Sequence, residues 1–148
     1  MKKILLTGAS GFIGFNTLIS LVDKNHVTII LRKKNKQIIN LKKKKRIKII
    51  YFKNFVGLNK SLKKIKVDYI IHCATHYIKK HTYADIMQMN FSNILFGNII
   101  LENLKFLKAK KFINLTTVWE NYNGIKGNSN NLYSVYKQSF TNIIRYYQ

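Results

Sequence analysis

Several features that restrict fold and function are scarce in this chain of 148 residues. It has no proline, one tryptophan and one cysteine, and it has only 5 acidic residues against 27 lysines and arginines. Because Cys73 is the only cysteine, an internal disulfide and a cysteine-based zinc cluster are excluded. No apolar run approaches the roughly 20 residues of a transmembrane helix. The longest run, over 94–101, is interrupted by Gly97 and Asn98.

The first residues do not predict a cleaved leader. Met1, Lys2 and Lys3 precede only four apolar or small residues before Gly8, whereas a signal peptide has a longer apolar segment. Because 47% of the residues are hydrophobic and 13% are aromatic, the chain is too apolar to be disordered. The composition predicts a cytoplasmic protein with one domain, residues 1–148, and no metal site.

The formal net charge of +22 has two interpretations. Strongly basic chains often bind nucleic acids or anionic membranes. Here the lysines are scattered, apart from the run at 42–46, and they accompany many asparagines and isoleucines. This combination is typical of an AT-rich genome and says little about partners. Nucleic-acid binding is therefore an alternative that we do not expect to be the main function.

Short apolar runs alternate with segments of helical periodicity along the chain. Strands are predicted at 4–6, 27–31, 47–52, 67–73 and 111–115, helices at 12–23, 83–108 and 132–147, and a polar connection with one or two helical turns at 33–46. Nearly continuous apolar strands separated by helices are typical of a parallel sheet covered on both faces. The expected fold is a doubly wound, Rossmann-like α/β sheet with strand order 3-2-1-4-5. Since complete sheets of this type have six strands or more, we expect the fold to be incomplete at the C-terminus.

A glycine-rich turn, TGASGFIG at 7–14, falls between the first predicted strand and the first predicted helix. The first glycine permits a tight turn, the second lets the backbone approach a pyrophosphate, and the third lets helix and strand pack closely. The N-terminal end of the helix would then bind the phosphates. The turn therefore predicts a dinucleotide site whose candidate residues are Gly8, Ser10, Gly11, Phe12, Ile13 and Gly14.

The end of the second predicted strand distinguishes between two cofactors. Enzymes that use NAD place an acidic residue there for the ribose 2′-hydroxyl. This chain has Arg32 followed by Lys33 and Lys34. An arginine can bind a 2′-phosphate through two hydrogen bonds, whereas a carboxylate would repel it. NADP(H) is therefore favoured over NAD(H), although the three cations could also reflect the general abundance of lysine.

Tyr133 and Lys137 lie four residues apart in the last predicted helix, so they share one helical face. Phenols ordinarily ionise with a pKa of about 10, and a neighbouring ammonium favours the ionised form. We therefore predict that Tyr133 exchanges a proton with a substrate and that Lys137 assists it. Thr117, with Thr116 as the alternative, follows the fifth predicted strand at the edge where ligands bind, and its hydroxyl could orient a substrate carbonyl.

Together these motifs resemble the extended short-chain dehydrogenase/reductase family, which comprises NAD(P)-dependent epimerases, dehydratases and reductases of nucleotide sugars. The matching segments are TGASGFIG at 7–14, DYIIHCAT at 68–75, Asn90 within the long helix, INLTT at 113–117 and YSVYK at 133–137. The stretches 114–124 and 131–140 more narrowly resemble a branch of CDP-abequose synthase-like reductases.

The resemblance implies a role for each matched residue. Tyr133 would be the catalytic acid/base, Lys137 its partner and a ligand of the cofactor ribose, and Thr117 the hydroxyl that orients the sugar oxygen. The other implied cofactor residues are His72, Ala74 and Thr75 on the nicotinamide side and Asn90 in the long helix. The family's C-terminal part, which binds the nucleotide sugar, is expected to be absent from this chain.

The function implied by this resemblance is reduction of the 4-keto group of a CDP-linked deoxysugar with NADPH, in the biosynthesis of lipopolysaccharide O-antigen. The alternatives are another epimerase or dehydratase activity on a nucleotide sugar, an inactive truncated remnant that binds NADP(H), and the nucleic-acid-binding protein considered above. The family also implies a possible homodimer through the long helix and the Tyr–Lys helix.

Overall fold

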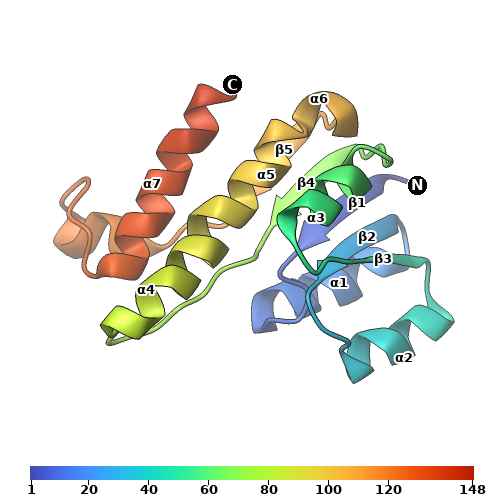
Figure 1. Cartoon of the computed structure of the whole chain (residues 1–148), viewed down its shortest axis with the longest axis horizontal. Helices are drawn as coiled ribbons and strands as arrows, with labels where there is room; N and C mark the ends of the chain where they lie inside the picture. The colour runs from blue at the N-terminus through green and yellow to red at the C-terminus, as the bar shows by residue number, and fades with distance from the viewer. The chain divides into compact units, whose positions relative to one another are not determined.

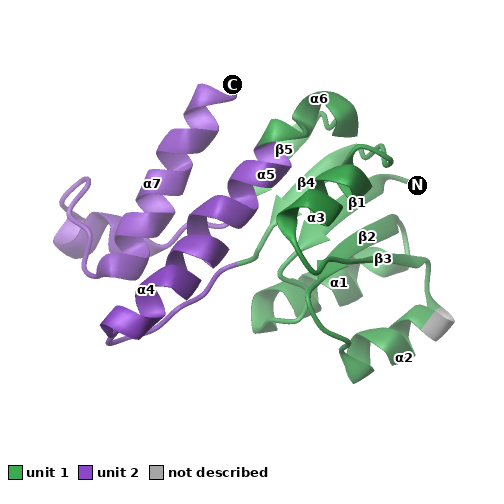
Figure 2. Ribbon diagram, viewed as in Figure 1, with its two compact units in different colours: residues 1–74, 102–113 green, residues 75–101, 114–148 purple. Residues whose placement is uncertain are grey.

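The computed structural model of the chain describes residues 1–42 and 45–148, and it divides into two compact units (Figure 2). Unit 1 comprises residues 1–74 and 102–113, and unit 2 comprises residues 75–101 and 114–148. In the part of the chain that the structure describes, no helix has the length and the apolar character needed to cross a bilayer.

Unit 1 is built on a parallel sheet with the strand order β3-β2-β1-β4-β5, which confirms the predicted order and the α/β class (Figure 1). Its elements in chain order are β1 (Lys3–Thr7), α1 (Phe12–Val22), β2 (His26–Leu31), α2 (Lys36–Lys44), β3 (Ile47–Tyr51), α3 (Phe55–Leu62), β4 (Tyr69–His72), α6 (Leu104–Leu107) and β5 (Lys111–Asn114). The central strand β1 pairs in parallel with both β2 and β4.

The core of unit 1 follows from the alternation of side chains along the strands. Leu6 of β1 and Ile29 of β2 pack with Leu18 of α1 and Ile38 of α2 in one cluster of fully buried side chains. Neighbouring strand residues such as Leu5 are equally buried, although alternation turns them to the opposite face. Both faces of the sheet are therefore covered at its central strands, as expected for a parallel sheet, whereas no residue of the edge strand β5 is buried.

Two helices of unit 1 differ from the expectation. The connection at 33–46 contains α2, whose nine residues make more than two turns, and the side chain of Asn35 caps it by accepting from the Ile38 N–H. The segment 55–62, for which no helix or strand is predicted, forms α3, and Asn54 caps it in the same way. In both segments a short amphipathic pattern is stabilised by an asparagine cap and by a few buried apolar residues.

Unit 2 contains α4 (Tyr83–Asn90), the π-helical turn η1 (Phe91–Leu95), α5 (Phe96–Glu102), the 3-10 segment η2 (Val118–Gly124) and α7 (Leu132–Tyr146). The predicted helix over 83–108 is therefore interrupted at η1 and again before α6. The C-terminal helix α7 agrees closely with the prediction over 132–147. It lies beside α5 (Figure 1), where Gly97 of α5 leaves room for the buried ring of Phe140.

Candidate active site

The glycine turn after β1 has a backbone that excludes side chains at two positions. Gly8 has a φ of +71°, and a Cβ on it would lie 2.6 Å from the backbone nitrogen of Ala74. A Cβ on Gly14 would lie 2.2 Å from the carbonyl oxygen of Gly8. Both glycines are therefore required by close contacts between backbone segments, which keep β1, the start of α1 and the segment after β4 together.

Gly11 differs from these two glycines. Its N–H donates to the Gly8 carbonyl at 2.9 Å, and an added Cβ would meet only that oxygen, at 3.4 Å. Gly11 is exposed, it begins α1 without a side-chain cap, and the first turn of α1 has no acidic residue. Ser10, Phe12 and Ile13 are exposed beside it. The turn thus offers an uncapped helix start with a positive dipole end, which suits the pyrophosphate of a dinucleotide.

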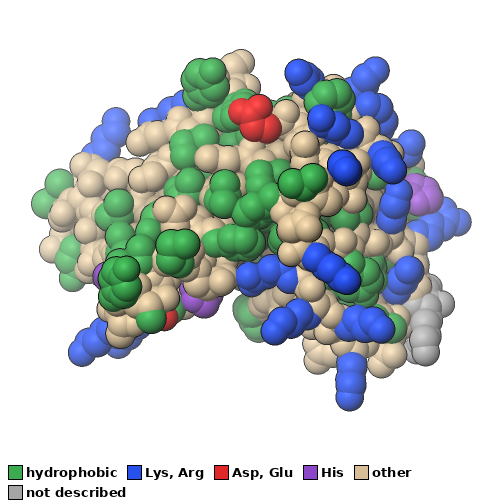
Figure 3. Space-filling view, in the orientation of Figure 1, with side chains coloured by type: hydrophobic (Ala, Val, Ile, Leu, Met, Phe, Trp, Pro, Cys, Tyr) green, Lys and Arg blue, Asp and Glu red, His purple; other side chains and the backbone are tan. Residues whose placement is uncertain are grey.

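The basic residues after β2 are exposed, and lysine and arginine side chains are numerous over unit 1 on the face shown in Figure 3. Arg32 directly follows the last residue of β2, and Lys33 and Lys34 continue the chain before α2 begins. No acidic residue occurs between Asp23 and Asp68 in the sequence. The charge at this strand end is therefore positive, as the prediction of NADP(H) requires, whereas the preference between the two cofactors stays a prediction.

His72 occupies a buried position in unit 1. It lies opposite Thr7 in the register of β4 and β1, and its Nδ1 is 2.9 Å from the Thr7 hydroxyl oxygen. That oxygen also accepts a hydrogen bond from the Ala74 N–H at 3.1 Å. With His72 only 1% exposed and its ring 5.8 Å from that of Phe112, this network fixes the backbone against which Gly8 packs.

In unit 2, Asn93, a buried asparagine that is not among the predicted site residues, holds the segment after β4. Asn93 Oδ1 accepts from the Thr75 hydroxyl and from the His76 N–H, each at 2.8 Å, and its Nδ2 donates to the His76 carbonyl at 3.0 Å. Asn93 is 2% exposed and lies in the π-helical turn, whereas Asn90, the predicted residue, is exposed at the end of α4. The sequence signal was a polar residue within an apolar stretch of a helix, a position that calls for hydrogen-bond partners. The predicted role of Asn90 stays a prediction.

Tyr133 and Lys137 lie in the first two turns of α7. Asn131 caps this helix, since its side chain accepts from the Ser134 N–H at 2.9 Å and its own N–H donates to the Ser134 hydroxyl at 3.1 Å. Tyr133 is half-buried, and Lys137 is only 3% exposed. The cap fixes the start of the helix, so the four-residue spacing places both side chains on one face.

Tyr133 is in contact with two further aromatic residues from separate segments of unit 2. Its ring centroid lies 5.1 Å from that of Tyr77, at an interplanar angle of 70°, and 6.4 Å from that of Trp119, at 81°. The rings of Tyr77 and Trp119 are 5.4 Å apart. Edge-to-face contacts of this kind are favourable. The rings of Tyr77 and Trp119 therefore restrict the orientation of the Tyr133 phenol.

Thr117 begins η2 and takes part in its cap. Its hydroxyl oxygen accepts from the Trp119 N–H at 3.4 Å, and its own N–H donates to Glu120 Oε1 at 3.3 Å. A hydroxyl that accepts one hydrogen bond retains its own proton for donation. Thr117 thus has a fixed backbone and a donor suited to a carbonyl oxygen, and Thr116 is exposed.

The structure therefore contains two clusters of predicted site residues, one in each unit. In unit 1, the turn at 7–14 packs against the segment ending at Ala74 and is braced by His72. In unit 2, Thr75 is joined to η1, and Tyr133 is joined through its aromatic neighbours to η2, which Thr117 begins. That the two clusters serve one reaction stays a prediction.

The parallel sheet and the glycine turn define an α/β protein of the dinucleotide-binding class. The model of the NAD dependent epimerase/dehydratase family matches residues 4–148. The chain belongs to this family of NAD-dependent enzymes.

Two curated relatives have similar sequences. A dTDP-D-glucose 4,6-dehydratase of Dictyostelium discoideum is 33% identical over 128 residues, and a CDP-abequose synthase of Salmonella muenchen is 30% identical over 124 residues. These matches cover 79% and 82% of this chain. The chain spans only 29% and 39% of the relatives' own lengths.

Solved structures share the fold. The UDP-Glc/GlcNAc 4-epimerase of Campylobacter jejuni matches 99% of this chain with a TM-score of 0.86 and 20% identity. The UDP-glucuronic acid 4-epimerase of Bacillus cereus, in complex with NAD, matches 98% with a TM-score of 0.78 and 24% identity. The chain spans 49% and 51% of these two proteins, which is about half of each.

Proposed function

We propose that this chain carries the cofactor-binding and proton-donating part of an NADP(H)-dependent reductase that acts on the 4-keto group of a CDP-linked deoxysugar. The observation that carries the proposal is the position of Tyr133 one helical turn before the buried Lys137, in a chain that belongs to this family. The CDP-linked substrate is supported by the 30% identity to the Salmonella CDP-abequose synthase, an enzyme of the kind expected for O-antigen sugars.

The residues of unit 2 have complementary roles in this reaction. Bound NADPH would supply a hydride to the carbonyl carbon of the sugar. Tyr133 donates its phenolic proton to the oxygen, on which negative charge develops, and Thr117 donates a hydrogen bond to the same oxygen. The ammonium of Lys137 stabilises the phenolate that remains on Tyr133. The aromatic contacts of Tyr133 hold its ring in one orientation, which lowers the entropic cost of the proton transfer.

In unit 1, Gly8, Gly11 and Gly14 would hold the pyrophosphate, and Arg32 would bind the 2′-phosphate. These two roles are supported by the first turn of α1, which has no side-chain cap, and by the exposed guanidinium and ammonium groups after β2. NADPH is then expected to bind more tightly than NADH, and equilibrium titrations of the chain with each cofactor measure the difference.

The test of the reaction uses an active version of the protein that includes the part that binds the nucleotide sugar. It compares that protein with its Tyr133→Phe variant in the presence of NADPH and a CDP-linked 4-keto-deoxysugar. The reductase oxidises one NADPH for each carbonyl reduced, which the loss of the dihydronicotinamide absorbance records. Tyr133→Phe should abolish turnover and leave cofactor binding intact, because it removes only the phenolic oxygen. Turnover unchanged in this variant would refute the assignment of Tyr133.

Other outcomes identify the alternatives. The 33% identity to a dTDP-D-glucose 4,6-dehydratase favours a dehydratase as the second candidate. A dehydratase or an epimerase would convert its nucleotide sugar without net oxidation of NADPH. A chain that binds NADPH and turns over no nucleotide sugar would be the remnant that binds the cofactor alone.

We also propose a homodimer through α4 and α7. Both helices carry exposed apolar side chains, namely Tyr83 and Met87 on α4, at 91% and 80% exposed, and Val135 and Tyr146 on α7, at 42% and 85%. Tyr83 and Met87 lie on adjacent turns of α4, and Val135 and Tyr146 lie about three turns apart on one face of α7. Exposed apolar side chains that share a helical face are suited to an interface between copies. Light scattering of the purified chain distinguishes the dimer from the monomer.

A further inference from the structure

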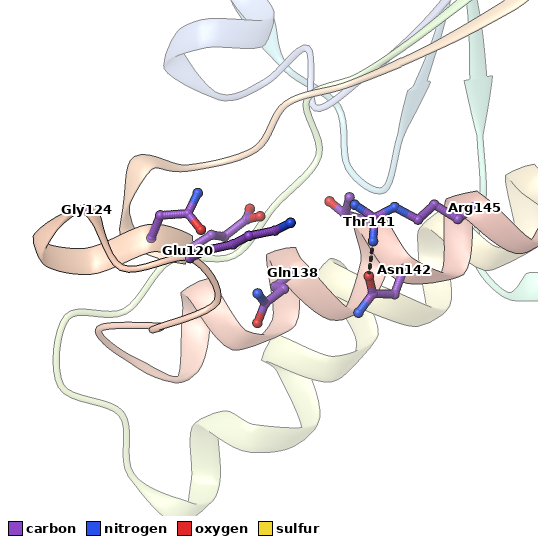
Figure 4. A pocket seen from close by; sticks show the side chains of 8 residues that line it. Glu120, Gly124, Gln138, Thr141, Asn142 and Arg145 are labelled. Atoms are coloured by element: carbon purple, nitrogen blue, oxygen red, sulfur yellow. Dashed lines mark hydrogen bonds between the residues drawn. The ribbon is translucent and has the colours of Figure 1, made fainter.

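Unit 2 contains a cavity of about 460 Å³, open to solvent, on a side of α7 that the proposed reaction does not use (Figure 4). One wall comes from η2 and the loop after it, and the other comes from α7. The lining residues are Glu120, Asn121, Gly124, Lys126, Gln138, Thr141, Asn142 and Arg145. The volume falls in the range of about 300–1,000 Å³ that is typical of small-molecule sites.

The wall formed by α7 is distinct from the face that carries Tyr133 and Lys137. Its four residues, at 138, 141, 142 and 145, follow the spacing of a single helical face. At about 100° per residue, the centre of this face lies roughly a third of a turn from the Tyr133 side. A ligand in the cavity would therefore be bound by side chains other than the proton donor and its lysine.

The charged groups of the cavity have both signs. Lys126 and Arg145 supply two cations, and Glu120 supplies the one carboxylate among the lining residues. Glu120 is 9% exposed, and one of its oxygens accepts from the Thr117 N–H. A carboxylate has capacity for several hydrogen bonds, so Glu120 can accept from further donors.

The remaining side chains are amides and one hydroxyl. Gln138 lies across from Glu120, and Asn142 Oδ1 accepts from Arg145 at 2.9 Å (Figure 4). This bond directs the guanidinium along the helix and leaves it further N–H donors. None of the lining side chains is aromatic, so the cavity offers no stacking surface for a nucleobase.

We propose that this cavity binds an anionic carbohydrate group, a hydroxylated ring that carries a phosphate or a carboxylate. Arg145 and Lys126 bind the anion, Glu120 accepts from ring hydroxyls, and the amides supply donors and acceptors to the same hydroxyls. A bare anion gains from the two cations and is repelled by Glu120, whereas a neutral sugar gains nothing from the cations. Only a ligand that has both an anionic group and ring hydroxyls can interact with the cations, with Glu120 and with the amides at the same time. The inference goes beyond the proposed reduction and does not depend on it.

The test is a titration of the chain with three probes, glucose 1-phosphate, glucose and inorganic phosphate. Calorimetric titration measures each affinity, and the side-chain amide resonances of Gln138 and Asn142, which line the cavity, report on the wall formed by α7. Glucose 1-phosphate should bind about tenfold more tightly than either of the other probes. Equal affinity for glucose 1-phosphate and inorganic phosphate, or no saturable binding of any probe, overturns the proposal.

Variants locate the binding within the cavity. Arg145→Gln should weaken glucose 1-phosphate about tenfold, because a charge-assisted hydrogen bond is lost. The matched control is Lys79→Gln, which removes one charge from an exposed lysine of unit 2 outside the cavity, and it should leave the affinity unchanged. Equal effects of the two substitutions would show a response to net charge alone and would contradict the proposal.

The Glu120→Gln variant tests the contribution of the sugar hydroxyls to binding separately from that of the anion. Glutamine keeps an oxygen that can accept from the Thr117 N–H, so the start of η2 is preserved. Inorganic phosphate should then bind more tightly, since the repelling charge is gone, and the preference for glucose 1-phosphate should shrink. An unchanged preference would show that Glu120 does not contact the sugar. NADPH binding, measured in the same samples, should not respond to any of these substitutions, so a failure of this site is distinguishable from a failure of the proposed reaction.

Discussion

Each unit contains a glycine at which a side chain would not fit, and the obstacle differs. In unit 1 a Cβ on Gly8 would collide with the backbone of Cys73 and Ala74, whereas in unit 2 a Cβ on Gly97 would lie 2.2 Å from the ring of Phe140. A backbone has little freedom to move, but a ring can shift or be replaced by a smaller side chain. Unit 1 therefore depends on contacts between backbone segments, and unit 2 on the fit of particular side chains.

The largest effect is expected for Gly8→Ala. A left-handed residue with a side chain costs roughly 1–2 kcal/mol, and the backbone collision adds about 1–3 kcal/mol, so the variant should lose about 3 kcal/mol of unfolding free energy. Urea unfolding followed by circular dichroism measures this loss.

Gly11→Ala is the matched control in the same turn. Because the added methyl group would meet only the Gly8 oxygen at 3.4 Å, we expect a change in stability below about 1 kcal/mol. Cofactor binding should nevertheless weaken, since the methyl group would occupy the approach of the pyrophosphate. Equal destabilisation by the two substitutions would contradict the distinction between a glycine required by the fold and one required by the ligand.

The next largest effect on stability is expected in unit 2. Asn93→Ala removes three hydrogen bonds to Thr75 and His76, and it should cost about 2 kcal/mol because buried partners lose their bonds. Asn90→Ala, at an exposed position three residues earlier, should change stability by less than about 0.5 kcal/mol. Hydrogen exchange of the His76 amide tests the cause directly, since its exchange should accelerate in the first variant and stay as it is in the second.

A smaller net effect is expected for Gly97→Ala. Replacing a glycine within a helix by alanine stabilises it by about 1 kcal/mol, while overpacking against Phe140 costs about 1–3 kcal/mol. The variant should therefore be destabilised by about 1 kcal/mol, as measured by thermal or urea unfolding. In the double variant with Phe140→Leu, the loss should be smaller than the sum of the two single losses, because the smaller side chain makes room. Strict additivity would show that the ring is not the obstacle.

The smallest effects on stability are expected for two carboxylates, one in each unit. The Lys3 N–H lowers the pKa of Asp68, and the Thr82 N–H followed by the Thr82 hydroxyl lowers the pKa of Asp85. A lowered folded-state pKa gives stability that is present above the unfolded-state value of about 3.9 and is lost as the pH falls through the folded-state value. Asp68→Asn and Asp85→Asn should each slightly lower the urea midpoint at neutral pH. Each difference from the original chain should shrink below about pH 4, and a difference that grows in acid would reverse the assigned sign.

The difference between the units also explains what could be predicted from the sequence. The strands, their order and the glycine turn follow from apolar runs and from glycines that the backbone requires, and these are local patterns. The Tyr133–Lys137 spacing is local as well. The polar Asn93 within an apolar helical stretch indicates that this residue needs hydrogen-bond partners. Which partners it has depends on the π-helical turn, because they lie 17 and 18 residues away. The cavity beside Arg145 likewise depends on how an irregular segment packs against α7.

The most direct test of the central claim is a titration with NADPH followed by the fluorescence of Trp119. The dihydronicotinamide absorbs where tryptophan emits, and Trp119, the only tryptophan, contacts Tyr133 in unit 2. If the glycine turn binds the cofactor whose nicotinamide serves Tyr133, NADPH quenches this emission saturably, Tyr133→Phe keeps the quenching, and Gly11→Ala weakens it. Absence of saturable quenching, or the same quenching in Gly11→Ala, would contradict the account.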